Sequence, residues 1–494
     1  MSTVVRSEGP PLGGATPRVP SAAPDAIALW AALMAFVYLA FCWLAWDRTM
    51  LPDEIWALTH AERSWPEQIA SIRADLVHPP LFYLLERAWI GIFGFSDFTA
   101  KLLPVLINLV AISLFPVLAC RITKGWRIAS VLFLTIYLHV FSTPNLVRMY
   151  GLVLLLTLAS MWAWDRWRLR PTGGRLLTWT MIMSFAVMTH YFGALLLATY
   201  VLLAWGIAPK PKAIALASIV PALLFCAWVA YVFPIYAAHG LKANLGWVQP
   251  SLFLAMTVVP FHFLTTIPSG TNPIHADWWD ALPARQLLLA AAMAVHVALV
   301  ALAFWRKSLA RTQRDWLVTL FAIACAPALM LAVASRIVGP AFDSRFLVGA
   351  LPAYWLLIAL LSDLGGRPGA MLLRAVIAPA ALLAVILPLS HDLFESPLRQ
   401  AVTHIVEEYK PGDIVMSDNN GTQAYWELRR AGLTLPWAFV PTMSHYSWLA
   451  APATIPDRAW VFCRGDCNAT IRGLLRDHAM VRRHGEFLAL FERQ

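Results

Sequence analysis

Long apolar runs, separated by short polar loops, occupy most of the chain. A helix needs about 20 residues to cross the hydrocarbon of a bilayer, so residues 26–390 are predicted to form eleven membrane-spanning helices. The runs lie near 26–46, 98–119, 126–141, 149–164, 176–190, 192–208, 212–234, 285–305, 315–335, 346–363 and 370–389. Two shorter runs, Leu81–Phe95 and Ser251–Leu264, contain charged residues, proline or histidine. We expect them to lie along the membrane surface; counting both as spans would give 13.

Composition and charge agree with this arrangement. Apolar residues make up 59% of the 494 residues and charged residues only 13%, as in a polytopic membrane protein. The formal charge of +10 lies mainly in alternate loops: five of them hold fifteen Lys and Arg residues, and the three short loops between them hold four. Because positive loops face the cytoplasm, we expect a disordered cytoplasmic tail (1–25), and loop 47–97 and the C-terminal part on the other face of the plasma (inner) membrane. This distribution disfavours nucleic acid as a partner.

Residues 391–494 are less apolar and predict a small extracytoplasmic α/β domain, because helical and strand patterns alternate there. Helices are expected at Val402–Tyr409 and Thr422–Arg430. Strands are expected at Ile414–Met416, Trp460–Cys463 and Phe487–Phe491.

Two cysteines in this domain, Cys463 and Cys467, flank a short Arg-Gly-Asp segment. Outside the cytoplasm two thiols at this spacing are able to form a disulfide that closes a tight loop. A reduced pair is the alternative. No histidine or second cysteine pair lies at ligand spacing from them, so we expect no metal site there.

An acidic pair, Asp53 and Glu54, directly follows the first apolar run. Unpaired charge is costly at the edge of a bilayer, so a pair of carboxylates there suggests a function. A carboxylate at this position is able to deprotonate a hydroxyl acceptor at the interface. The alternative is an ordinary helix start, because acidic residues are also favoured in the first turn of a helix.

A second polar group, His78-Pro79-Pro80, follows about two dozen residues later and precedes the apolar run that begins at Leu81. A histidine at this place is a candidate ligand for a substrate group on the non-cytoplasmic side. The alternative is structural, because proline favours the start of a helix and His78 would then only cap that helix.

Two arginines open spanning helices on the same side of the membrane. Arg148 lies two residues before Tyr150, and Arg345 lies two residues after Asp343. A base on this side opposes the general charge bias and therefore requires an anionic partner. A phosphate would suit the planar guanidinium fork. A salt bridge between Asp343 and Arg345 is the alternative for the second arginine.

These residues together resemble a known family. The acidic pair after the first span and the His-Pro-Pro-Leu-x-Tyr segment at 78–83 are similar to those of the membrane-embedded glycosyltransferases with the C-type (GT-C) fold. The branch concerned is related to protein O-mannosyltransferases and lipid A aminoarabinose transferases. Gly94-Phe95-Ser96 with Lys101, the Arg-Met-Tyr segment at 148–150 and the late arginine support the resemblance. It covers roughly residues 26–165 and is supported again near 340–363.

The resemblance implies an inverting transfer of one sugar from a polyprenyl-phosphate donor on the non-cytoplasmic face. Asp53 would be the catalytic base, and Glu54 would be its neighbour in the acceptor cleft. His78 takes the place of a residue near the carrier phosphate. Arg148 and Arg345 would hold the departing phosphate; Tyr150, in the same Arg-Met-Tyr segment, is counted with the donor-binding residues.

One departure from the family pattern concerns a second carboxylate. Relatives commonly have an acidic residue two positions before the arginine of Arg-Met-Tyr, where this chain has Leu146, preceded by Asn145. We therefore expect no metal ion or other cofactor. The sequence specifies neither the sugar nor the acceptor. Another lipid-linked transferase or ligase, a transporter or flippase, or a scaffold are the alternatives to a glycosyltransferase.

Overall fold

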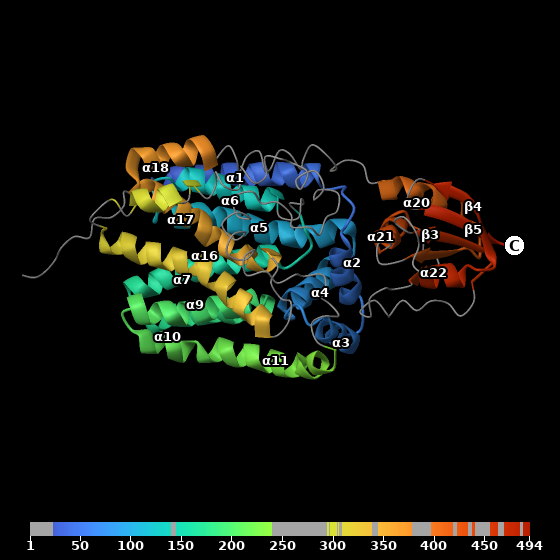
Figure 1. Cartoon of the computed structure of the whole chain (residues 1–494), viewed down its shortest axis with the longest axis horizontal. Coiled ribbons are helices and arrows are strands. Elements are labelled where there is room, and N and C mark those ends of the chain that lie inside the picture. Colours follow the sequence, from blue (N-terminus) through green and yellow to red (C-terminus); the bar gives the residue numbers. More distant parts are fainter. Residues whose placement is uncertain are drawn as a thin grey trace, which may run out of the picture.

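The computed structural model describes residues 23–139, 145–239, 294–295, 297–303, 305, 309–337, 344–377, 397–417, 422–432, 437–439, 455–462, 469–484 and 488–494. Long helices lie side by side in a bundle, and a smaller domain with a sheet lies beyond one end of that bundle (Figure 1). The predicted Ser251–Leu264 helix, Cys463 and Cys467 lie outside the described residues, as does the tail up to residue 22.

Most predicted spans correspond to helices of the bundle. The elements are α1 (Pro24–Leu44), α5 (Asp97–Ala119), α6 (Trp126–His139), α7 (Tyr150–Leu169), α8 (Gly173–Thr189), α9 (Phe192–Ile207), α10 (Pro211–Ala217), α11 (Ile219–His239), α16 (Arg311–Ile337), the 3-10 helix η2 (Ser344–Ala350), α17 (Leu351–Leu364), α18 (Gly366–Leu372) and the π-helical η3 (Leu373–Ile377). The predicted 212–234 span is divided at Ser218 into α10 and α11. The predicted 346–363 span comprises most of η2 and α17.

Five helical segments in the described part of the chain are long and apolar enough to cross a membrane: Pro24–Leu44, Asp97–Ala119, Pro211–Ala238, Arg311–Ser335 and Phe346–Leu364. Large apolar side chains on their outer faces, such as Leu29 and Phe36, are exposed. A face of this kind needs hydrocarbon around it. The chain is therefore a multi-pass membrane protein. The total of 11 or 13 spans stays a prediction, because 285–293 and 378–390 lie outside the described residues.

Three short helices follow α1 and lie at the end of the bundle that faces the smaller domain (Figure 1). They are α2 (Pro52–Ala61), α3 (Trp65–Asp75) and α4 (Leu81–Phe93). α3 begins at a capping box, in which the carboxylate of Glu67 accepts hydrogen bonds from the backbone N–H and the hydroxyl of Ser64. α4 occupies the run that the sequence predicts as a surface helix, so the spans α1 and α5 are separated by a small helical layer.

The smaller domain is the α/β unit that the sequence predicts. It contains α20 (Pro397–Glu408), β1 (Ile414–Ser417), α21 (Thr422–Arg430), β2 (Trp437–Phe439), β3 (Arg458–Phe462), α22 (Ala469–Leu474), β4 (His478–His484) and β5 (Leu488–Arg493). The sheet has the order β2-β1-β3-β5-β4; β1 is parallel to β2 and β3, and β5 is antiparallel to β3 and β4. Val415 and Trp460 pack with α20 and α21 on one face, and Met416 and Val461 pack with α22 on the other.

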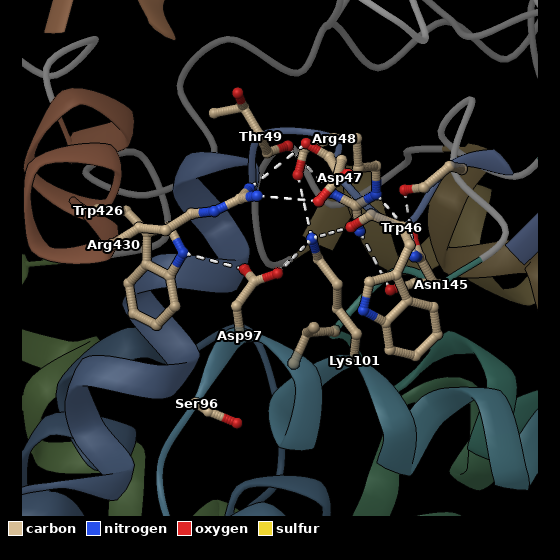
Figure 2. A network of polar contacts seen from close by, with 12 residues as sticks. Trp46, Asp47, Arg48, Thr49, Ser96, Asp97, Lys101, Asn145, Trp426 and Arg430 are labelled. Atoms are coloured by element: carbon tan, nitrogen blue, oxygen red, sulfur yellow. Dashed lines mark hydrogen bonds and ion pairs between the residues drawn. The ribbon is translucent and has the colours of Figure 1, made fainter. Parts of the chain in front are cut away.

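Helix α21 joins this domain to the end of the bundle. Arg429 forms two hydrogen bonds of 2.7 Å with the carboxylate of Glu62, just after α2. Arg430 donates to Asp47 Oδ1 at 2.9 Å, just after α1 (Figure 2). The loop between α1 and α2, which directly precedes the acidic pair, therefore contacts α21.

Candidate functional site

The acidic pair is organised by a buried arginine that the sequence does not single out. Arg48 donates from Nη1 and Nη2 to the two oxygens of Glu54 at 2.7 and 2.6 Å. It also donates from Nε to Oδ1 of Asn145 at 2.7 Å. The backbone N–H groups of Val147 and Leu51 donate to Glu54 at 2.7 Å each. Glu54 thus links the first loop to the segment before α7.

These contacts separate the roles of the two acids. The Glu54 residue is 0% exposed and its oxygens accept four hydrogen bonds. It therefore does not line an acceptor cleft, contrary to what the resemblance implies. The backbone N–H of Leu51, the N-cap residue of α2, donates to Glu54. Glu54 therefore has the helix-start role that the sequence analysis gave as the alternative for the acidic pair. Asp53, one position earlier in α2, is exposed, so of the two it is the acid that an acceptor is able to reach.

A buried lysine, Lys101, binds the backbone that precedes the acidic pair in the sequence (Figure 2). Nζ of Lys101 donates to the carbonyl oxygens of Trp46 and Arg48 at 2.6 and 3.0 Å and to Oδ2 of Asp97 at 2.9 Å. The other oxygen of Asp97 accepts from the indole of Trp426 at 3.2 Å. Lys101 is fully buried. It therefore holds the end of α1 and the start of α5 together and connects them to α21.

Arg148 lies beside Asp53. Its Nη1 donates to the backbone oxygen of Asp53 at 3.1 Å, and its side chain is buried. Its Nε is buried without a hydrogen-bond partner among the described residues. The guanidinium interacts electrostatically with Tyr83, Asp53, Tyr150 and Asp75. The predicted phosphate ligand and the predicted base are thus neighbours, although they are 95 positions apart in the sequence.

His78 lies on the same cluster. Its Nδ1 is 3.2 Å from Oδ2 of Asp75 and 3.4 Å from the hydroxyl oxygen of Tyr83. The helix that follows has Pro80 at its N-cap position and no side-chain capping bond. The capping alternative for His78 is therefore wrong, and both ends of the His-Pro-Pro-Leu-x-Tyr segment face the same group of polar residues.

His190 completes the cluster and is a residue that the sequence analysis does not select. It lies in the turn between α8 and α9, and its ring centroid is 5.3 Å from that of His78 and 6.2 Å from that of Tyr150. Its Nδ1 accepts from the backbone N–H of Phe192 at 3.0 Å, so Nε2 carries the proton of the neutral ring. Nε2 is buried without a hydrogen-bond partner among the described residues. The only sequence signal is a polar pair, His190-Tyr191, in the short break between two apolar runs.

The turn at His190 depends on a glycine. A Cβ at Gly193 would overlap the backbone of Ala186. Only glycine therefore lets α9 start this close to the end of α8, which brings His190 against His78. We refer to Asp75, His78, Tyr83, Arg148 and His190 as the Arg148 cluster.

The remaining candidates lie at the border of the Arg148 cluster. Tyr150, the first residue of α7, is buried against His190. Arg345 belongs to η2, and its side chain lies outside the described residues. The next residue, Phe346, has its ring centroid 5.6 Å from that of His190 and 6.3 Å from that of His78. Arg345 is therefore the sequence neighbour of a residue, Phe346, that contacts two histidines of the cluster.

Glu86 of α4 is a further acid that is buried near this cluster. Neither of its carboxyl oxygens has a hydrogen-bond partner among the described residues. Burial raises the pKa of Glu86 well above its ordinary value, and the positive charge of Arg148 opposes that effect. Burial therefore favours the neutral form of this side chain, whereas Asp53 is exposed and is the acid that an acceptor hydroxyl is able to reach.

The described part of the chain holds one group of three metal-ligating side chains at ligand distance, His404, Glu408 and His484, and this group lies in the α/β domain. Leu146, at the position where the resemblance leads us to expect a second acid, is buried, as is the preceding Asn145, which accepts a hydrogen bond from Arg48. The amide of Asn145 thus supports the Arg48–Glu54 pair, and neither residue supplies a second carboxylate.

Comparison with solved structures gives the fold. No protein-family profile and no curated protein matches the chain. Two crystal structures of ArnT from Cupriavidus metallidurans, one bound to undecaprenyl phosphate and one in the apo state, are similar to it at a TM-score of 0.55 and 14% identity. The matches cover 95% and 94% of this chain and 98% of each ArnT chain. The chain has the GT-C fold. The fold expected from the sequence resemblance is confirmed, and the ArnT-like arrangement extends through the α/β domain.

Proposed function

We propose that the chain is an inverting glycosyltransferase that moves one sugar from a polyprenyl-phosphate donor to an acceptor on the non-cytoplasmic face of the membrane. One observation carries the proposal: the exposed acid Asp53 is adjacent to a buried guanidinium, Arg148, that has a donor group to spare. This pairing suits a reaction that needs a proton acceptor on one side and an anion-binding group on the other.

The chemistry follows from these two groups. The acceptor hydroxyl attacks the anomeric carbon of the sugar and passes its proton to the carboxylate of Asp53. A new C–O bond forms as the bond between the anomeric carbon and the phosphate oxygen breaks. The electron pair of that bond stays with the polyprenyl phosphate, whose added negative charge Arg148 stabilises. A single displacement of this kind inverts the configuration at the anomeric carbon.

The donor side of the site rests on the fold and on the Arg148 cluster. ArnT, which has the same fold, has been crystallised with undecaprenyl phosphate. A polyprenyl chain needs an apolar surface, which the exposed faces of the bundle helices provide. His78, Tyr150 and Arg345 would then surround the phosphate together with Arg148. The proposal requires no metal ion or other cofactor.

The function is tested by transfer of label from a polyprenyl-phosphate sugar. Purified protein in lipid is incubated with donors carrying different labelled sugars and with an envelope extract as the source of acceptor. We expect one donor to lose its label to an acceptor and to release polyprenyl phosphate. If the label crosses the membrane but stays on the lipid, the chain is a flippase. If no donor is consumed or moved, the proposal is wrong.

Arg148 should contribute to carrier binding. We expect Arg148→Ala to weaken polyprenyl-phosphate binding by roughly 10- to 100-fold, because a charge-assisted hydrogen bond is worth about 1.5–3 kcal/mol. Arg148→Lys should recover only part of this loss, since an ammonium lacks the planar fork. Binding is measured by titration of the lipid into the purified protein.

A matched control for Arg148 is Arg127→Ala, because Arg127 is an exposed arginine in the first turn of α6, beyond the other end of α5. It should bind the carrier as wild type does. Carrier binding that is unchanged in a well-folded Arg148→Ala protein would remove Arg148 from the phosphate site.

A further inference from the structure

A second polar cluster lies in the α/β domain, away from the Arg148 cluster. His404 and Glu408 are four residues apart on α20, and residues at this spacing share one face of a helix. His484 is the last residue of β4. Their ligand atoms all lie within 4.8 Å of one another. Two elements that are 70 residues apart in the sequence thus bring two imidazoles and one carboxylate together.

These side chains lie in direct contact with one another. The rings of His404 and His484 are stacked, with centroids 4.3 Å apart and an angle of 25° between their planes. Nε2 of His484 lies 3.8 Å from Oε1 of Glu408. This nitrogen is buried and makes no hydrogen bond to the described residues. A buried polar atom without a hydrogen bond carries a desolvation cost, which a bound ion would offset.

We propose that His404, Glu408 and His484 bind a divalent transition-metal ion, with Zn²⁺ as the best match. Two imidazole nitrogens and a carboxylate oxygen are a preferred ligand set for Zn²⁺. Bonds of about 2.0–2.2 Å place neighbouring ligand atoms of a tetrahedral site roughly 3.3–3.6 Å apart. The distance between the His484 and Glu408 ligand atoms is 3.8 Å, and all three ligand atoms lie within 4.8 Å of one another, so side-chain rotation must bring them closer to bind the ion. Three protein ligands leave a fourth position for water.

Arg482 competes with the metal for Glu408. Its Nη1 donates to Oε1 of Glu408 at 2.7 Å. The side chain of Arg482 is 58% exposed, so it can withdraw into solvent at little cost, as surface ion pairs contribute little stability. Removing this arginine should therefore strengthen metal binding, whereas removing a ligand should weaken it.

The site would connect two parts of the domain that the sheet does not connect. β4 is the terminal strand of the order β2-β1-β3-β5-β4 and is paired on one side only, with β5. Unprotected strand edges are prone to pairing with other chains. A metal bound between α20 and the end of β4 would hold this edge strand against the helix and would stabilise the folded domain.

The test uses the full-length protein, freed of metal with a chelator, in detergent. Co²⁺ is added as a spectroscopic probe and Zn²⁺ is titrated by calorimetry. We expect one tight equivalent of Zn²⁺, absorption bands of bound Co²⁺ in the visible range, and a higher melting temperature with metal. His484→Ala and Glu408→Gln should each weaken binding at least tenfold. His478→Ala is the matched control, since His478 lies on the same strand but outside the cluster, and it should bind as wild type.

Arg482→Gln gives a test that does not depend on removing a ligand, and we expect its Zn²⁺ affinity to rise several-fold. The proposal is overturned if wild type shows no Co²⁺ bands. It is equally overturned if His484→Ala and Glu408→Gln proteins bind Zn²⁺ as tightly as wild type, or if Arg482→Gln leaves the affinity unchanged. None of these readouts depends on sugar transfer, so failure here leaves the proposed function untouched.

Discussion

Asp53→Asn is expected to lower the rate of sugar transfer by roughly 10²- to 10⁴-fold, the usual effect of removing a general base. The amide keeps the size of the side chain but cannot take up the proton of the acceptor. The Asp53 backbone oxygen, which binds Arg148, is unaffected. Folding and carrier binding should therefore change little. The rate is measured with purified protein and labelled donor, beside lipid binding and melting temperature.

The matched control for this substitution is Asp47→Asn in the loop that precedes α2. Asp47 is an exposed acid whose carboxylate pairs with Arg430, and its replacement should leave the transfer rate within about twofold, since a surface ion pair is worth less than about 1 kcal/mol. Transfer at the wild-type rate by the Asp53→Asn protein would show that another group takes the proton.

Glu54→Gln is expected to destabilise the folded protein by about 3–5 kcal/mol, because it leaves the charge of a buried arginine without its partner. The Arg48 and Glu54 side chains are only 6% and 0% exposed. The NH₂ of the new amide would also lie against the backbone N–H of Leu51 or Val147. Both groups are hydrogen-bond donors, so this contact would be repulsive. We expect a lower melting temperature in detergent, measured by tryptophan fluorescence, and a lower yield of folded protein.

Glu62→Gln removes a surface carboxylate from a similar arginine pair and serves as the control. The side chains of Arg429 and Glu62 are 37% and 32% exposed, so we expect less than about 1 kcal/mol of destabilisation. A Glu54→Gln protein that is as stable as wild type but does not transfer sugar would reverse our assignment and make Glu54 the general base.

The helices of the bundle were predictable from the sequence because apolar length is a local property. The predicted span at 98–119 and α5 at Asp97–Ala119 differ by one residue at the start. Differences arise where a helix is interrupted locally: η2 precedes α17 with a 3-10 turn, which periodicity in the sequence does not reveal. In the α/β domain, β4 was missed because Arg482 and Arg483 in this edge strand are mostly solvated and break the apolar alternation that identifies a strand.

The site was only partly predictable, for a reason that concerns distance along the chain. The sequence singles out Asp53, His78 and Arg148 as candidates because each is a polar residue next to an apolar run. Neither the contacts of Arg48 nor those of His190 follow from their neighbours in sequence. Arg48 binds Asn145, 97 positions away, and His190 reaches His78 only because α8 and α9 meet closely at Gly193. Such residues depend on tertiary packing, which a single sequence does not reveal.

The contacts of Arg48 and Glu54 also set an order of events during synthesis and membrane insertion. Glu54 accepts from the backbone of Val147, and Arg48 donates to Asn145, so both side chains lack these partners until residue 147 has been synthesised. Helices α1, α5 and α6 therefore precede these partners in the chain, and the segment from Arg48 to Glu54 takes its final form only after them. Because α21 then docks on that same loop, completion of the site proceeds from the middle of the chain to its C-terminal domain, and an arrested chain that ends before α7 carries an unfinished acidic loop.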